Sequence, residues 1–231
     1  MAAFFLSGVA VVIHGRLLFG EMYVSGGLTL TAAVSLIGLQ LGVIGLLAAF
    51  NETLRGVSAG LLAPAALLAL AAGRGGEASG DLSVQMKVHV LTSMFAYGLL
   101  TVGAIVAIYA VVQDRRLRSA TLSPMNHLFA PLVTTEKLLF AVTAAGFTVL
   151  LLSVASGATF VEDLFAQHLV HKTTLSLIAL SIFGILLVGR QFAGWRGNRA
   201  VSLYLAGFLV LILAYFGSRF ILENMLGRSW G

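Results

Sequence analysis

A stripe of polar side chains runs through one of the long apolar stretches of the sequence. His89, Ser93 and Tyr97 are four residues apart, so in a helix the imidazole, the hydroxyl and the phenol share one face. Lipid offers such groups no hydrogen-bond partner, so this face should point toward protein or a cavity. One interpretation is a histidine at the headgroup level, with hydroxyls bonded to the carbonyls of their own helix. The other is an axial ligand of haem iron, for which neutral imidazole is the usual choice.

Further histidines lie in two other places. His14 is expected toward the outer end of the first helix, either as a second iron ligand or in an interfacial role. His168 and His171 are three residues apart, and Glu162 and Asp163 precede them. Histidines and carboxylates together can bind a divalent metal, but an ordinary solvated loop also has this composition.

Cations are expected at the same side of the membrane as these histidines. Arg219 ends the last apolar run, Lys87 precedes His89, and Lys172 follows His171. Such side chains could pair with the propionates of haem, although snorkelling to the headgroups explains all of them equally well.

The composition defines the elements that must position these residues. Of the 231 residues, 59% are hydrophobic and 10% are charged, which is outside the range of soluble domains. Runs without a charged side chain recur at about the 20 residues that cross a bilayer as a helix. They predict an all-α, polytopic transmembrane helical bundle with about seven membrane-spanning helices, over Ala2–Gly15, Met22–Asn51, Gly56–Gly73, Val88–Gln113, Leu138–Val161, Thr173–Gly189 and Ala200–Ser218.

The charge pattern predicts how this bundle is oriented. With seven helices, eight Lys and Arg residues fall on one side and six on the other, which places the amino terminus in the cytoplasm and the carboxyl terminus outside. Because the net charge of +5 is spread over short loops, it indicates membrane orientation and excludes a nucleic-acid partner. The chain has no cysteine, so thiolate chemistry is excluded. Short connections predict a single integral membrane domain over residues 1–231.

Smaller signals concern packing. Gly38, Gly42 and Gly45 form a small-residue face that lets helix backbones approach one another. Pro64 should kink its helix or free a carbonyl, and Trp195 is typical of an interfacial anchor.

Three segments resemble the cytochrome c assembly family of membrane haem handlers, which includes the CcsA, CcmC and HemX proteins. Val88–Ala110 resembles the segment that follows the first external haem-ligand histidine. Glu136–Phe160 is similar to the helix that ends in a Ser-Gly-Ala-x-aromatic turn, and Gly194–Phe220 resembles the closing hairpin. The matches occur in family order, cover about residues 85–222, and most resemble the YpjD-type branch. The resemblance implies a multi-pass protein of the bacterial cytoplasmic (inner) membrane.

Two departures from the family concern the haem site. The loop FVEDLFAQHLVHK, Phe160–Lys172, has no tryptophan, whereas the family loop at this place is a tryptophan-rich haem platform. The synthesising members also have an external histidine after the last matched helix, and ILENMLGRSWG has none. His89 matches the first external ligand, while the resemblance leaves His171, His168 and His14 all open as the second.

The resemblance and the residues together predict a haem-binding or haem-handling membrane protein that does not itself join haem to cytochromes. A b-type haem would be bound by His89 and His171 as iron ligands, with His14 as the other ligand candidate and with Tyr97, Phe165 and Arg219 around it. One alternative is a cofactor-free membrane scaffold or accessory subunit that binds other membrane-protein subunits. Another is a transporter or metal-ion pathway through the loop histidines, against which the helix interiors contain almost no ionisable side chains.

Overall fold

The computed structural model describes residues 2–25, 29–72, 83–118, 131–160 and 170–217, and over these residues it contains helices and no strand. The predicted all-α bundle is therefore confirmed. In chain order its elements are α1 (Ala2–Ser25), α2 (Leu30–Ala49), the 3₁₀ helix η1 (Glu52–Leu54), α3 (Arg55–Ala69), α4 (Val84–Arg118), α5 (Leu132–Phe160), α6 (Val170–Ala193), α7 (Gly197–Ile212) and the π-helical turn η3 (Leu213–Gly217).

Six of the described helices are long and apolar enough to cross a membrane: α1, α2, α4, α5, α6 and α7. The exception among the predicted seven is α3, which has 15 residues and continues through Pro64. Fifteen residues of α-helix are about 22 Å long, whereas the hydrocarbon core is about 30 Å thick. The α3 helix is therefore shorter than a full span.

The boundary between the first two helices differs from the prediction. The α1 helix does not end near Gly15 but continues to Ser25, so His14 lies near its middle and not toward its outer end. The charges of Arg16 and Glu21 had marked a break between two apolar runs. Within the helix, the Glu21 carboxylate accepts hydrogen bonds from the hydroxyls of Thr29 and Thr31, at 3.1 and 3.0 Å. Because Thr29 also caps the start of α2, this acid joins the last part of α1 to the start of α2.

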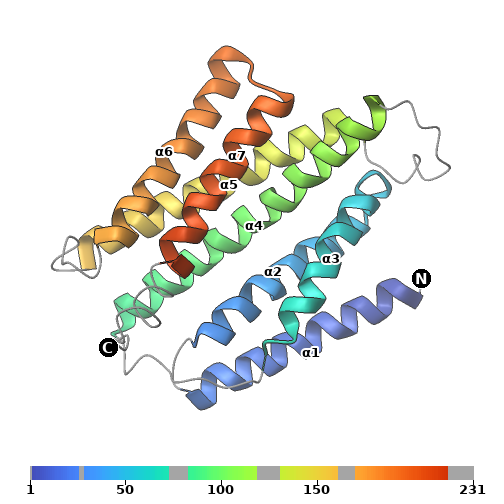
Figure 1. Ribbon diagram of the computed structural model, residues 1–231. Coiled ribbons are helices and arrows are strands. Elements are labelled where there is room, and N and C mark those ends of the chain that lie inside the picture. Colours follow the sequence, from blue (N-terminus) through green and yellow to red (C-terminus); the bar gives the residue numbers. More distant parts are fainter. Residues whose placement is uncertain (1, 26–28, 73–82, 119–130, 161–169, 218–231) are drawn as a thin grey trace.

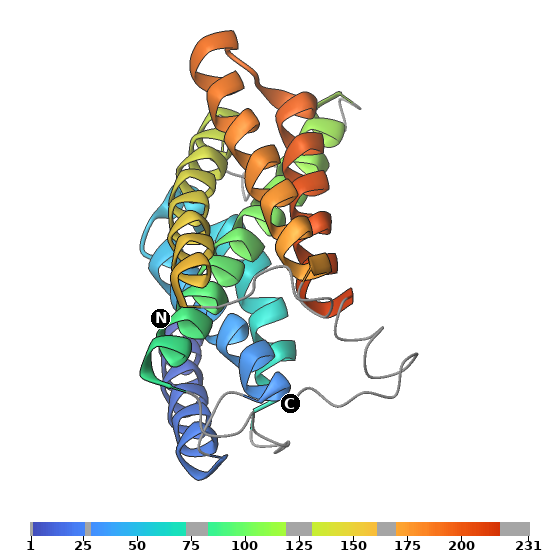
Figure 2. The same ribbon diagram turned by 90° about the vertical axis from the view of Figure 1, so that its left-hand side faces the viewer.

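The helices form two groups that meet along α4 (Figure 1). In Figure 1, α1, α2 and α3 lie together on one flank, and α6 and α7 lie on the other. The α4 helix packs against α2 and α3 from the first group and against α5 and α7 from the second. Figure 2 shows the same helices from the side, with the α6–α7 turn at one end of the bundle.

The small-residue face predicted on α2 lies in close helix contacts. A Cβ atom added at Gly38 would be 2.7 Å from the Leu68 Cβ of α3, and one at Gly42 would be 3.0 Å from Val11 of α1. Without side chains at these positions, α1 and α3 approach the α2 backbone closely. The predicted packing role is confirmed.

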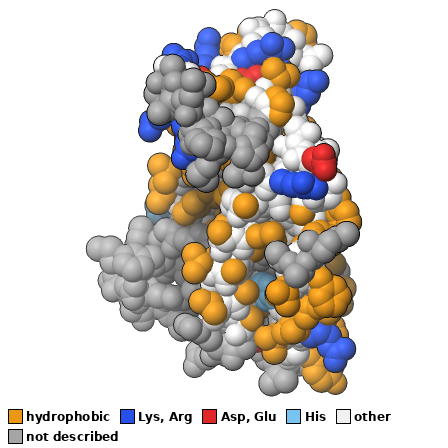
Figure 3. Space-filling model, turned by 90° about the vertical axis from the view of Figure 1, so that its right-hand side faces the viewer, with side chains coloured by type: hydrophobic (Ala, Val, Ile, Leu, Met, Phe, Trp, Pro, Cys, Tyr) orange, Lys and Arg blue, Asp and Glu red, His pale blue; other side chains and the backbone are white. Residues whose placement is uncertain are grey.

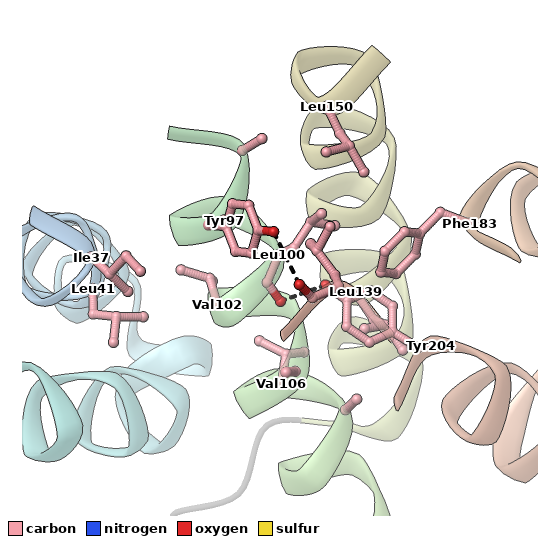
Figure 4. Packing of buried hydrophobic residues seen from close by; sticks show 14 of the residues in the cluster. Ile37, Leu41, Tyr97, Leu100, Val102, Val106, Leu139, Leu150, Phe183 and Tyr204 are labelled. Atoms are coloured by element: carbon pink, nitrogen blue, oxygen red, sulfur yellow. Dashed lines mark hydrogen bonds between the residues drawn. The ribbon is translucent and has the colours of Figure 1, made fainter. Parts of the chain in front are cut away.

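Two long polar side chains join α4 to its neighbours in the core. The Tyr204 hydroxyl of α7 donates a 2.7 Å hydrogen bond to the Leu100 carbonyl, and its ring lies against Gly103, where a Cβ would collide with it. Figure 4 shows this contact beside Leu139 and Phe183. On the opposite side, the Gln40 amide of α2 donates to the Met94 carbonyl at 3.3 Å and lies over Gly98. Glycines of α4 therefore provide space for polar side chains from both groups.

Candidate functional site

The stripe predicted from His89 lies between α4 and α5. His89 occupies the first part of α4 and is half-buried. Its ring packs over Gly157, where a Cβ atom would come within 3.0 Å of the imidazole Cε1. Any larger residue at position 157 would push the ring away from α5, so this glycine permits the observed position of the histidine.

A hydrogen-bond chain determines which nitrogen of His89 carries its proton. The Ser156 hydroxyl donates its hydrogen to the Ser153 carbonyl at 2.8 Å. Because a hydroxyl has one hydrogen to donate, Ser156 must accept the 2.9 Å hydrogen bond from the His89 Nδ1–H. Neutral imidazole protonated at Nδ1 leaves a lone pair on Nε2. This is the tautomer that a metal or haem iron requires when it binds through Nε2.

The next residue of the stripe also faces α5. The Ser93 hydroxyl donates to the His89 carbonyl at 2.8 Å and lies 2.6 Å from the Ser153 hydroxyl. Since the hydrogen of Ser93 is used on the carbonyl, Ser153 is the donor between the two hydroxyls. The stripe therefore faces α5, and the Ser93 hydroxyl is bonded to a carbonyl of its own helix, as the first of the two interpretations expects.

Tyr97 continues the stripe into the core. Its side chain is buried, and its hydroxyl donates a 3.0 Å hydrogen bond to the Leu211 carbonyl of α7. This carbonyl lies just before η3, where the helix widens into a π turn. Tyr97 therefore joins α4 to the end of α7 and contacts Tyr215, with 5.7 Å between the ring centroids.

The α6 helix brings a cation to the same end of the bundle. Lys172 Nζ lies 5.4 Å from the centroid of the Tyr215 ring, within range of a cation–π interaction. It is also close enough to His89 for the two side chains to interact electrostatically. His171, one residue earlier, is exposed at the start of α6. We call His89, Ser153, Ser156, Lys172 and Tyr215 the His89 cluster.

The second ligand candidate in α1 lies elsewhere. His14 is buried, and its Nε2 is 2.7 Å from the Ser35 hydroxyl of α2. The α1 helix packs against α2. His14 therefore belongs to a separate polar contact between the first two helices, and its Nε2 is already engaged there.

Several predicted residues lie outside the described part of the chain. These are Glu162, Asp163, Phe165, His168 and Arg219. Within the described ranges, no group of three or more histidine or acidic side chains is arranged to hold a metal ion. Of the predicted residues, His89 and Lys172 belong to the His89 cluster, and Tyr97 contacts Tyr215 of that cluster.

Sequence reasoning missed the α5 side of the cluster. The signal was present in SVASG, where Ser153, Ser156 and Gly157 recur at the three- and four-residue spacing of one helix face. Small residues at this spacing mark a close helix contact. What the pattern could not show is that the partner across this contact is His89.

Comparison with known proteins identifies the family of this chain. The family model described as cytochrome C assembly protein matches residues 3–226. The inner membrane protein YpjD of Escherichia coli strain K12 is 35% identical over 136 residues, which are 59% of this chain and 51% of that protein. The cytochrome c biogenesis protein CcsA of Guillardia theta is 23% identical over 162 residues, 63% of this chain and 54% of that one.

The chain spans about half the length of the curated relatives that it matches. No solved structure gives a significant match. The family model covers nearly the whole chain, and the described helices suit a multi-pass inner-membrane protein. The chain therefore belongs to the cytochrome c assembly protein family.

Proposed function

We propose that this protein binds haem in the inner membrane through His89 and handles it without joining it to cytochromes. The observation that carries the proposal is the Ser153–Ser156–His89 hydrogen-bond chain, which leaves a lone pair on Nε2. An imidazole prepared in this way is suited to an axial position on b-type haem iron.

The surroundings of His89 support the same cofactor. Lys172 supplies a cation near the imidazole, and a haem propionate is an anion that needs such a partner. Tyr215 supplies an aromatic ring beside that cation. His171 is the proposed second ligand, since it lies next to Lys172 at the start of α6. When bound, haem would supply the redox and ligand chemistry, while these residues would hold and orient it.

The proposal does not extend to haem attachment. A loop that stacks a porphyrin flat against several tryptophans would suit that reaction, and the loop Phe160–Lys172 has no tryptophan. Binding, storage or transfer of haem makes no such demand.

A second candidate function is a cofactor-free scaffold that assembles with other membrane-protein subunits. It is favoured because the hydroxyls along the polar stripe already have hydrogen-bond partners within the protein. Tyr97 donates to the Leu211 carbonyl, Ser93 donates to the His89 carbonyl, and Ser153 donates to the Ser93 hydroxyl. A helix interface closed in this way holds together without a ligand.

An absorption spectrum of the purified full chain tests the first proposal against the second. Protein purified in detergent from haem-replete cells should show a Soret band, and H89A should lose it. H14A is the matched control, because it removes a buried, serine-bonded imidazole from a different helix pair. A colourless wild-type protein that copurifies with a stoichiometric partner would overturn haem binding in favour of the scaffold. An unchanged band in H89A would overturn the role of His89.

A further inference from the structure

The ammonium group of Lys172 is directed toward an aromatic ring. Lys172 is the second residue of the membrane-spanning segment of α6, which begins at His171, and its side chain is only partly exposed. Its Nζ lies 5.4 Å from the centroid of the Tyr215 ring. The negative face of an aromatic ring attracts a cation, and more strongly where water is excluded. The ring therefore holds this cation toward the protein, whereas a lysine at such a position could otherwise extend to the headgroups.

The Tyr215 ring is itself held in place by α4. Its centroid lies 5.7 Å from that of the Tyr97 ring, and Tyr97 is buried with its hydroxyl bonded to the Leu211 carbonyl. The η3 turn, which carries Tyr215, also packs against α6. Three helices thus meet at this ring, and the cation is positioned by groups that do not share its helix.

The same helix that holds Tyr215 also carries His89. His89 and Tyr97 are eight residues apart on α4, which is about two helical turns. Lys172 is close enough to His89 for the two side chains to interact electrostatically. The contacts through Tyr97 and Tyr215 therefore relate the position of the ammonium to that of the imidazole.

We propose that Tyr215 is a positioning residue, which holds the Lys172 ammonium beside His89 so that the site selects iron porphyrins with free carboxylates. This inference rests on the proposed function and names the class of ligand more closely. The porphyrin ring is rigid, so its carboxylate side chains leave it at fixed places relative to the iron. A cation held at a fixed place relative to the iron-binding imidazole meets a carboxylate without a further loss of side-chain freedom.

Titration of the full chain with two porphyrins tests this selection. Protein purified in detergent from haem-deficient cells is titrated with haem and with haem dimethyl ester, whose side chains are uncharged, and the Soret band reports binding. The ratio of the two affinities is compared between variants, because partitioning of each porphyrin into detergent then cancels. K172M should lower the ratio by roughly tenfold, the effect of losing one charged hydrogen bond.

The Tyr215 variants separate positioning from a purely structural role. Y215L removes the aromatic face and should lower the ratio by about threefold, whereas Y215F keeps that face and should leave the ratio unchanged. If Tyr215 acts through the lysine, the double variant K172M/Y215L should have the same ratio as K172M. K87M and Y23L are the matched controls, since both remove an exposed side chain of the same type, and neither should change the ratio.

A measurement without haem follows the lysine directly. The chain has only three lysines, Lys87, Lys137 and Lys172, so lysine labelled with ¹³C at the ε-carbon gives a simple NMR spectrum. The ε-methylene signal that is absent in K172M should be displaced upfield by the Tyr215 ring. This displacement should remain in Y215F and disappear in Y215L. Unchanged melting temperature and helix content would show that the variants are folded.

The outcomes distinguish this inference from the function on which it rests. If neither porphyrin gives a Soret band with the wild type, both are overturned. If both porphyrins bind through His89 and K172M leaves their ratio unchanged, carboxylate selection is overturned and haem binding stands. Additive effects of K172M and Y215L, or a lysine signal that Y215L does not move, would overturn the positioning role of Tyr215.

Discussion

At the residue scale, the position of one hydrogen atom connects the fold to the proposed chemistry. Ser156 cannot donate to His89, because its own hydrogen is used on a backbone carbonyl of α5, and so it accepts the hydrogen of His89 Nδ1. The α5 backbone thus fixes the tautomer of a histidine on α4. Such outer partners of a ligating histidine fix its orientation and raise its basicity.

Replacing Ser156 by alanine tests this connection. S156A removes the acceptor for Nδ1–H without removing the imidazole, so the ring can turn or change tautomer. We expect haem affinity to fall about 10- to 100-fold, as is typical for the loss of such a partner, measured by titrating the apoprotein with haem. S181A is the control, because Ser181 is exposed on α6 and bonds only to its own helix. Equal affinities for S156A and wild type would contradict a tautomer set by this serine.

A second residue-scale prediction concerns the Tyr204 hydroxyl. Y204F removes its hydrogen bond to the Leu100 carbonyl but keeps the ring against Gly103. We expect the free energy of unfolding to fall by about 1 kcal/mol, whereas Y204A, which also empties a fully buried site, should cost about 3–5 kcal/mol. Denaturant titration in mixed micelles measures both. Y23F is the control at an exposed tyrosine. If Y204F were as unstable as Y204A, the hydrogen bond and not the buried ring would provide most of the stability, which would contradict the prediction.

At the scale of elements, the sequence predicted the helices well because charge-free runs of span length have few other structures available in lipid. The predicted end of the first helix was wrong because a charged residue was taken to mark a helix end. Glu21 remains inside α1 because Thr29 and Thr31 satisfy it, a contact that no periodicity reveals. The short α3 was similarly counted as a span, since its apolar run continues past the helix end at Ala69.

The candidate site was only half predictable for a related reason. Spacing along one helix identified His89, Ser93 and Tyr97, because residues four apart share a face. The partners Ser156 and Leu211 lie 67 and 114 residues from the side chains that they contact. Which residues meet across two helices depends on their relative rotation and offset, and these are set by packing of the whole bundle.

The contact between the two helix groups gives a prediction at this scale. G98A would place a methyl group against the Gln40 carboxamide, and overpacking of this kind costs about 1–3 kcal/mol. The loss should be relieved in the double variant Q40A/G98A, as a thermal-unfolding double-mutant cycle would show. G60A is the control, because nothing lies closer than 3.9 Å to the added Cβ atom. Additive effects of Q40A and G98A would contradict this contact.

At the scale of the whole molecule, the two ends of the bundle differ in character. One end holds the His89 cluster, and the other holds the arginines in the last turns of α4 and α6, where Figure 3 shows Lys and Arg side chains toward the top of the view. At the latter end, the Trp195 ring packs over Gly189 and under the guanidinium of Arg199, whose carbon is 3.9 Å from the ring centroid. The predicted interfacial tryptophan thus also closes the turn between two helices.

This asymmetry allows the orientation to be tested directly. The chain has no cysteine, so a single introduced cysteine reports its own position. If the more basic end faces the cytoplasm, as positive charge predicts, R116C should resist a membrane-impermeant maleimide in intact cells. V84C, at the opposite end of the same helix, should react. Both positions are exposed and should react after permeabilisation; the reverse pattern in intact cells would contradict the predicted topology.

The π turn at Leu213–Gly217 follows α7 directly and changes the direction in which the side chains after it point. One extra residue in a helical turn displaces the following side chain by about 100° around the axis. A regular continuation of α7 would direct Tyr215 away from its present neighbours, Tyr97 and Lys172. Inserting or deleting a single residue here would therefore change the direction in which the Tyr215 ring points around the helix axis. The part of α7 that packs in the core would keep its contacts.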